Sequence, residues 1–239
     1  MAKYDPWAET YAANRVARTE TIGAVIEYGA ITKADKVLEV GSGTGNHIIA
    51  IKKSIGCEAF GLDQSGAMIR QAEARRSGIV FQQGDAEALT FDDAFFDVIF
   101  SVDVIHHLTS SEDYFRTAKR VLRPGGRFVT LTHSHDMLRH NVLAAKYWPK
   151  IIDYEIDRYP PTERLLAELA AAGFRNIEDH AMTYPRLVKE DTPYRNKAFS
   201  GLHSVSEEDF EAGLQQLADD LANGPIENVG SYLVLAATA

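Results

Sequence analysis

The stretch VLEVGSGTGN, residues 37–46, decides the predicted fold. A short apolar run is followed by Gly41, Gly43 and Gly45, which alternate with small polar residues. Glycine adopts a positive φ without strain and lets backbone N–H groups come close to a ligand. A dinucleotide fingerprint would need its third glycine at position 46, which is Asn46 here, so the spacing disfavours a pyrophosphate. The stretch therefore predicts a strand and a sharp turn, which either contacts a ligand or is a tight turn only.

Short apolar strands alternate with amphipathic helices from Asp35 to about Leu131. The segment after the glycine turn has helical spacing, with Ile48, Ile51 and Ile55 on one face. Such alternation predicts parallel strands joined by right-handed crossovers, a doubly wound α/β sheet with helices on both faces. Ligands of these sheets bind beyond the carboxyl ends of the strands. Function is therefore expected after Val40, Leu62, Gly84, Phe100 and Leu131.

The composition argues against several classes of protein. The 239 residues carry a formal net charge of −9, which repels a phosphate backbone, so no nucleic-acid partner is expected. Cys57 is the only cysteine, which excludes an internal disulfide and a cysteine-cluster metal site. No apolar stretch reaches membrane-spanning length, and the first residues are polar. We therefore expect a cytoplasmic protein with no membrane partner.

Acidic residues follow the next two predicted strands. Asp63 lies about 20 residues after the glycine turn, where a carboxylate can bind the hydroxyls of a ribose. Its alternative role is to cap the following helix. Asp85 lies in the segment GDAEAL, where it could accept a hydrogen bond from an exocyclic amine such as that of adenine. Alternatively, Asp85 is an ordinary acidic residue of the loop. Turn chemistry alone does not readily explain why the glycines, Asp63 and Asp85 follow three successive predicted strands.

Five motifs occur in order between about Val37 and Val129: VLEVGSGTGN, GLDQSGAM, GDAEALTF, FDVIFSVDVIHHL and VLRPGGRFV. Together they resemble the class I S-adenosylmethionine-dependent methyltransferases, particularly the small-molecule type related to ubiquinone and menaquinone biosynthesis. The resemblance implies a Rossmann-like, seven-stranded sheet that is mostly parallel. Its last strand, SYLVLAATA, would run antiparallel beside RNIEDHAMTY. S-adenosyl-L-methionine is the implied methyl donor, and S-adenosyl-L-homocysteine the product.

The resemblance also implies roles for individual residues. Gly41, Gly43 and Gly45 would wrap the methionine part of the cofactor, with Glu39 just behind them. Asp63 would bind the ribose hydroxyls. The other implied contacts are Gln64 and Met68 flanking the adenine, Asp85 and Ala86 at its edge, Ser101 beside the sulfonium, and Tyr11 on an N-terminal helix that also carries Tyr4 and Arg15. That helix has an alternative interpretation as an ordinary surface helix.

We expect one methyltransferase domain over residues 1–239, with an N-terminal helical lid at 1–30. Residues 133–160 and 185–229 are insertions relative to the predicted sheet, and we expect them to form the acceptor pocket. Long irregular insertions are more often binding lids than filler. Their aromatic residues either hold a small-molecule acceptor or form the core of the lid: Tyr147, Trp148, Tyr154, Tyr159, Tyr184 and Tyr194.

Histidines follow the fourth and fifth predicted strands, at positions expected to border the acceptor. Because imidazole takes up a proton near neutral pH, His107, His133 and His106 are candidate general bases for a hydroxyl or an acidic carbon. Each has an alternative role in packing or at the surface, and positioning without a base can also accelerate the reaction. The spacing His133-x-His135 offers neither converging ligands nor a second shell, so no metal site is expected.

Motifs that the chain lacks narrow the acceptor. The fourth strand is followed by SVDVIHH and not by the Asn/Asp-Pro-Pro-aromatic segment of amino-methylating nucleic-acid enzymes, and no Pro-Cys nucleophile is present. We therefore expect transfer to an O, N or C nucleophile of a small molecule, by a monomer or homodimer. Two alternatives are a cofactor-binding sensor or scaffold without turnover and, less favoured, an NAD-dependent oxidoreductase.

Overall fold

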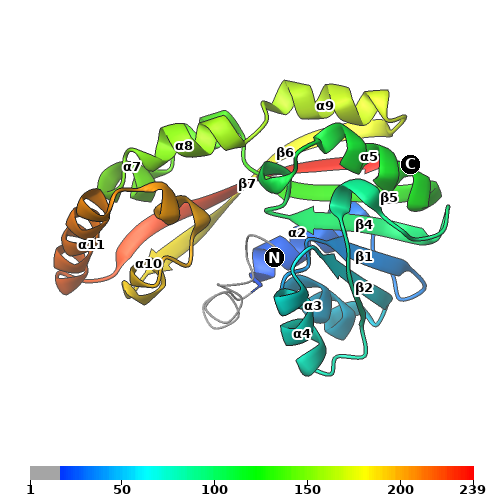
Figure 1. Ribbon diagram of the computed structural model, residues 1–239, viewed down its shortest axis with the longest axis horizontal. Coiled ribbons are helices and arrows are strands. Elements are labelled where there is room, and N and C mark those ends of the chain that lie inside the picture. Colours follow the sequence, from blue (N-terminus) through cyan, green and yellow to red (C-terminus); the bar gives the residue numbers. More distant parts are fainter. Residues whose placement is uncertain (1–16) are drawn as a thin grey trace. The chain divides into compact units, whose positions relative to one another are not determined.

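The computed structural model describes residues 17–239, apart from the side chain of Val142. In this part of the chain, seven strands form one sheet in the order β3-β2-β1-β4-β5-β7-β6 (Figure 1). The strands are β1 (Lys36–Val40), β2 (Glu58–Asp63), β3 (Val80–Gln83), β4 (Phe96–Val102), β5 (Leu122–Thr132), β6 (Arg175–Val188) and β7 (Ile226–Thr238). Tyr11 and the other predicted N-terminal lid residues up to position 16 lie outside the described residues.

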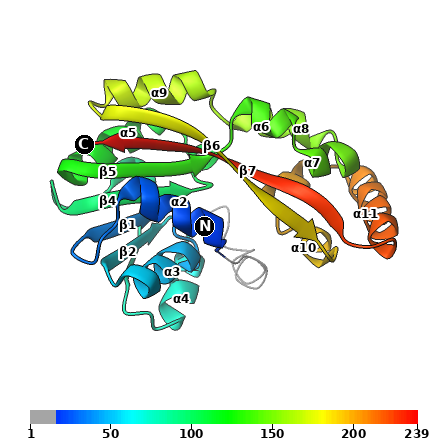
Figure 2. The same cartoon turned by 180° about the vertical axis from the view of Figure 1, so that it is seen from behind.

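The pairing of the strands confirms the doubly wound prediction. Strands β1 to β5 pair in parallel, and the strand order reverses between β1 and β4. Val40 is in register with both Leu62 and Ser101, so the carboxyl ends of β1, β2 and β4 lie at one edge of the sheet. The C-terminal strands are antiparallel, and Figure 2 shows β7 running against its neighbours β5 and β6.

Helices cover both faces of the parallel part of the sheet. On one face lie α2 (Thr19–Gly29), α3 (Asn46–Ile55) and α4 (Gly66–Ala74), and on the other lie α5 (Ser111–Val121) and α9 (Thr162–Ala171) (Figures 1 and 2). The predicted apolar face of α3 is confirmed, because Ile48 and Ile51 are fully buried. Helix α5 begins with a side-chain cap, since the Ser110 hydroxyl accepts the backbone N–H of Asp113.

Helix α5 ends before Pro124 and the glycines that follow it. Val121 is its last residue, and β5 begins at Leu122. The residue before a proline is pushed towards extended backbone, which disfavours helix at Arg123. Leu122 then pairs with Phe96 at the start of β4, and the pairing shifts register before Val98 meets Arg127.

The chain forms two compact units. The first comprises the described residues up to 132 together with 163–180 and 234–239, and the second comprises 133–162 and 181–233. The long strands β6 and β7 contribute residues to both units, and β6 continues to Val188, beyond its predicted end at Tyr184. The remaining helices belong to the second unit: α6 (His135–Arg139), α7 (Val142–Tyr147), α8 (Ile151–Arg158), α10 (Thr192–Arg195) and α11 (Glu207–Ala222).

The predicted irregular character of residues 133–159 is wrong, because three short helices occupy most of this segment. Their starts are fixed locally: the Ser134 hydroxyl accepts the N–H of Met137, and the Asn141 side chain accepts that of Ala144. Such side chains satisfy first-turn N–H groups that have no partner within a helix. We did not recognise these caps in the sequence, because helices of this length carry almost no periodic pattern.

The second unit has a hydrophobic core of its own. Tyr147, Trp148 and Tyr194 belong to it and are at least 95% buried, together with Leu143, Ile151, Val188, Leu202, Phe210, Leu214 and Leu217. The rings of Trp148 and Tyr194 are stacked, with centroids 5.7 Å apart. Of the two roles that the sequence left open for these three aromatic residues, the structure therefore supports the core of the inserted unit.

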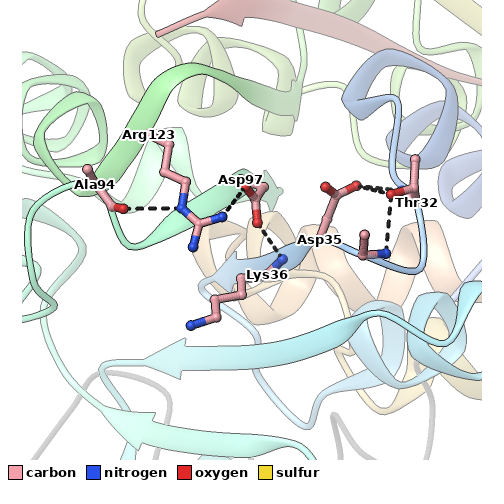
Figure 3. Close-up of polar contacts among 7 residues, drawn as sticks. Thr32, Asp35, Lys36, Ala94, Asp97 and Arg123 are labelled. Carbon is pink, nitrogen blue, oxygen red and sulfur yellow. Dashed lines mark hydrogen bonds and ion pairs between the residues drawn. The ribbon is translucent and has the colours of Figure 1, made fainter.

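A polar network joins the amino ends of β1 and β4, as Figure 3 shows. One oxygen of Asp97 accepts the N–H of Lys36 at 2.8 Å, and the other accepts the Arg123 guanidinium at 2.7 Å. Asp35 accepts both the N–H and the hydroxyl of Thr32 nearby. Because Lys36 begins β1 and the glycine turn follows its last residue, this network lies at the opposite end of the strand and holds the sheet together there.

Candidate cofactor site

The glycine turn between β1 and α3 can be built only from glycine at its key positions. Gly41, Gly43 and Gly45 all have positive φ, of 69°, 53° and 79°. A Cβ added to Gly41 would lie 2.3 Å from Cγ2 of Val104, and one added to Gly45 would lie 2.7 Å from Cζ of Phe81. Both distances are far below van der Waals contact. The turn therefore has the left-handed backbone that the sequence predicted, and it packs closely against Val104 and Phe81.

Asp63 connects the glycine turn to the end of β2. Its Oδ2 accepts the N–H of Gly43 at 2.7 Å, and its Oδ1 accepts the N–H of Ser65 at 2.8 Å. The alternative role as helix cap belongs instead to Ser65, whose hydroxyl accepts the N–H of Met68 at the start of α4. Asp63 itself is partly exposed.

Glu39 anchors the other side of the turn from inside the sheet. Its side chain is 1% exposed, Oε2 accepts the N–H of Ile48 at 3.0 Å, and Oε1 lies 3.1 Å from Nδ1 of His47. Burial raises the pKa of the Glu39 carboxyl above its ordinary value of 4.5, and the charge of Asp63 raises the pKa further. The contacts with His47 and Ile48 act in the opposite direction. The net effect is a carboxyl whose ionisation costs more in the folded protein than in the unfolded chain.

This raised pKa predicts a pH-dependent difference between the wild type and Glu39→Gln. Glutamine keeps an acceptor oxygen for Ile48 but carries no charge. A carboxyl with a raised native pKa favours the folded state below its unfolded value of 4.5, and loses that contribution as pH rises through the native pKa. The free energy of unfolding of the wild type relative to E39Q should therefore increase as pH falls from about 7.5 to about 5.

Urea unfolding of both proteins across this pH range measures the difference. The exposed Glu58→Gln serves as the control, because its carboxyl lies in solvent at the start of β2. A wild-type-minus-E39Q difference that stays constant with pH would contradict the raised pKa.

Two hydroxyls of the turn are buried without a hydrogen-bond partner in the part of the chain that the structure describes. They are Oγ of Ser42, which is 5% exposed, and Oγ1 of Thr44, which is 2% exposed. Buried polar groups in proteins are nearly always paired, so each such orphan calls for a reason. Both lie between the left-handed glycines, where the backbone already approaches neighbouring side chains closely.

The other predicted cofactor residues occupy different environments. Gln64 is exposed and its carbonyl accepts Nε2 of Gln83, whereas Met68 is buried in α4. Asp85 is exposed and caps the short helix η2 (Ala86–Ala88) by accepting the N–H of Glu87 at 2.9 Å. Ala86 is the first residue of that helix and is partly buried.

Ser101 is the predicted cofactor residue that the structure does not support as a side-chain contact. It is fully buried within β4, and its hydroxyl is hydrogen-bonded to that of Thr130 on β5 at 2.8 Å. The sequence placed Ser101 near the strand end, but the strand continues to Val102. The hydroxyl is therefore satisfied inside the sheet, and we do not retain it in the proposed site.

Two further residues at the strand ends were missed by sequence reasoning. Glu87 accepts the N–H of Thr109 at 2.6 Å and so links the ends of β3 and β4. Asp103 follows β4 with a φ of 58°, and its N–H donates to the carbonyl of Leu131 at 3.0 Å. Aspartate tolerates this left-handed backbone better than most residues, which was the only available signal. The Glu87 contact joins loops 22 residues apart and left no local pattern.

The candidate bases are distributed over both units. In the first unit, His107 is exposed and His106 is partly buried, and their ring centroids are 3.8 Å apart in helix η3 (Ile105–His107). In the second unit, His133 is stacked on Tyr232 at 4.9 Å and meets the edge of Tyr159 at 5.6 Å. Each unit thus offers a histidine with part of its ring accessible.

Among residues 17–239, no helix combines the length and the apolar character needed to cross a bilayer. Within the same residues, no group of three or more histidine, cysteine, aspartate or glutamate side chains is placed to hold a metal ion.

Comparison with known proteins shows similarity to methyltransferases. Residues 38–130 match the family described as methyltransferase domain. The ubiquinone/menaquinone biosynthesis C-methyltransferase UbiE of Azotobacter vinelandii is 29% identical over 187 residues, which cover 66% of this chain and 73% of that protein.

Two solved structures show the same fold. A protein of Anabaena variabilis, described as a methyltransferase from an antibiotic biosynthesis pathway, superposes with a TM-score of 0.75 at 21% identity, covering 95% of this chain and 99% of that one. Phosphoethanolamine N-methyltransferase 2 of Haemonchus contortus, solved with phosphomonomethylethanolamine and S-adenosylhomocysteine, has a TM-score of 0.66 at 19% identity, covering 98% of this chain and 57% of that one.

The parallel sheet, the glycine turn and these similarities define a Rossmann-like methyltransferase. The similarities support a class I S-adenosylmethionine-dependent methyltransferase. They favour this interpretation over an NAD-dependent oxidoreductase.

Proposed function

We propose that the ends of β1, β2 and β3 bind S-adenosylmethionine and that the protein transfers its methyl group to a small-molecule acceptor. The hydrogen bond from Gly43 to Asp63 carries this proposal. It places a carboxylate directly beside the left-handed glycine turn, at the edge of the sheet where ligands of such folds bind. In this arrangement the glycine turn faces the methionine part, and Asp63 accepts the ribose hydroxyls.

The residues of the turn suit such a ligand on physical grounds. The left-handed glycines let the chain turn sharply at the end of β1, and the hydroxyls of Ser42 and Thr44 lack a protein partner among the residues described. Polar ligand groups would satisfy them. We further propose that Gln64 and Met68 flank the adenine, and that Asp85 and Ala86 address its edge. Tyr11 remains a proposed lid residue.

S-adenosylmethionine supplies a methyl group activated by a positively charged sulfur. The protein must hold the acceptor nucleophile in line with that carbon, at about 3–3.5 Å, and exclude water. An acceptor hydroxyl or acidic carbon also loses a proton, for which His107, His106 and His133 are the proposed bases. An amine acceptor in its neutral form needs positioning only.

We propose that the second unit, including the stretches 133–160 and 185–229, binds the acceptor. The ring of His133, held between Tyr159 and Tyr232, supports this assignment because it presents a proton acceptor beside aromatic surfaces. The names of the relatives from ubiquinone and menaquinone biosynthesis describe carbon methylation, so carbon acids and quinols are the first acceptors to test. A cytoplasmic location for the protein is part of the same proposal.

Calorimetric titration with S-adenosylhomocysteine, beside NADH as the negative control, tests the donor site. Incubation with methyl-labelled S-adenosylmethionine and a panel of quinols, phenols, amines and carboxylates then tests turnover. We expect S-adenosylhomocysteine to bind, and we expect the labelled methyl group to be transferred to one class of acceptor. Absence of binding would refute the donor site, whereas tight binding without transfer to any acceptor would favour a sensor or scaffold.

A further inference from the structure

Helix α3 begins without a side-chain cap of its own. Its N-cap residue is Gly45, with a φ of 79°, and no side chain at that position accepts a hydrogen bond. The first-turn N–H groups of a helix have no partner within the helix. Here the acceptor comes from the neighbouring strand, because Oε2 of Glu39 accepts the N–H of Ile48 at 3.0 Å. Glu39 therefore replaces the missing cap and fixes the end of the glycine turn.

His47 holds the other oxygen of this carboxylate. Its Nδ1 lies 3.1 Å from Oε1 of Glu39, and its side chain is 22% exposed, so a ring that solvent can reach contacts a buried carboxylate. With the carboxylate as acceptor, the ring carries its proton on Nδ1 and donates it. A carboxylate held at both oxygens keeps one orientation, whereas one held only by Ile48 can rotate.

Other charged groups around the turn do not duplicate this contact. Asp63, at the end of β2, accepts the N–H of Gly43 and adds a second negative charge next to Glu39. Arg75, after α4, donates to the carbonyl of Thr44 and to Oδ1 of Asn46, so it braces the turn from outside. Among the described residues, His47 is the side-chain donor that the structure places on Glu39.

We propose that His47 is a positioning residue for the methyl donor. Its hydrogen bond to Glu39 orients the carboxylate that caps α3, and the capped helix fixes Gly45 and the turn that faces the donor. The inference rests on the proposed binding of S-adenosylmethionine at this turn. His47 acts through Glu39, so its loss should lower donor affinity and leave the chemical step unchanged at saturating donor.

The test compares two amide variants that place the N–H group of the side chain at different positions. In His47→Asn the side-chain amide nitrogen lies near the position of Nδ1, and in His47→Gln it lies near the position of Nε2. Calorimetry with S-adenosylhomocysteine should give a dissociation constant within about threefold of the wild type for H47N. The constant should rise about tenfold for H47Q and His47→Ala, as expected for a lost hydrogen bond to a charged group. Lys53→Ala, on the exposed face of the same helix, is the matched control.

Steady-state kinetics supply a readout that a purely structural role would not change. KM for S-adenosylmethionine should rise in H47Q, while kcat and KM for the acceptor stay at wild-type values. Equal affinities of H47N and H47Q would overturn the proposal, and so would an unchanged affinity in H47A. The comparison of H47N with H47Q tests the proposal even if H47A does not fold. Failure of the wild type to bind S-adenosylhomocysteine would instead refute the proposed donor site.

Discussion

Replacing Asp63 with alanine is expected to raise the dissociation constant for S-adenosylhomocysteine by about 10- to 100-fold. A hydrogen bond to a charged group contributes about 1.5–3 kcal/mol, and tenfold in affinity corresponds to about 1.4 kcal/mol. Asp63 contributes in two ways, because it is the proposed ribose ligand and because it accepts the N–H groups of Gly43 and Ser65. The alanine variant loses the ligand contact and releases the turn at the same time.

Calorimetric titration of folded D63A measures the effect directly, and Asp63→Asn separates its two causes. Asparagine keeps one oxygen acceptor for a backbone N–H but lacks the charge, so D63N should fall between the wild type and D63A. The exposed Asp92→Ala is the charge-matched control and should leave affinity unchanged. Wild-type affinity in D63A would remove Asp63 from the proposed site.

The second large effect is expected for Gly41→Ala, which should lower the free energy of unfolding by about 2–4 kcal/mol. Two costs combine in this variant. Alanine is strained at a φ of 69°, and its Cβ would lie 2.3 Å from Cγ2 of Val104, so the turn or the neighbouring loop must move. The displaced turn should also weaken binding of S-adenosylhomocysteine by more than about tenfold.

Chemical denaturation followed by titration of the folded variant checks both parts. Gly23→Ala is the matched control: it lies inside helix α2, and among residues 17–239 no heavy atom outside the helix backbone stands within 4 Å of the added Cβ. Alanine favours helix over glycine, so G23A should stabilise the protein by about 0.5–1 kcal/mol. Adding Val104→Ala to G41A should restore part of the affinity by removing the clash. Equal stability of G41A and the wild type would show that the turn tolerates a side chain.

The parallel half of the fold could be predicted because its signals are local. The apolar run before Gly41 and the helical spacing after it lie within 20 residues of chain. Each glycine of the turn adopts a positive φ, which explains why glycine occurs at that position. Asp63 could be proposed as the ribose ligand because such a ligand in this type of sheet follows the first turn at a regular distance. The role of Glu39 as a cap was not foreseen, since the contact with Ile48 depends on how the strand packs beneath the helix.

The second unit was harder to predict, because its organisation depends on contacts between distant segments. Trp148 packs against Phe210, and Tyr147 donates to Asp220, across 62 and 73 positions of the chain. No periodic pattern reveals which aromatic side chains will meet when a core is assembled from two separated pieces. The extension of β6 beyond Tyr184 was missed for the same reason, since a strand that includes Pro185 is defined by its partner and not by its own propensity.

The passage of β6 and β7 through both units constrains how such a protein can be recombined with its relatives. The second unit consists of residues 133–162 and 181–233, so two of its borders fall inside hydrogen-bonded strands. A chimera must therefore exchange both segments together and join each strand in register, because a slip of one residue turns every side chain to the other face. Simple shuffling of a contiguous module would break the sheet. Relatives of this protein can therefore diversify the second unit by point substitutions that leave β6 and β7 continuous.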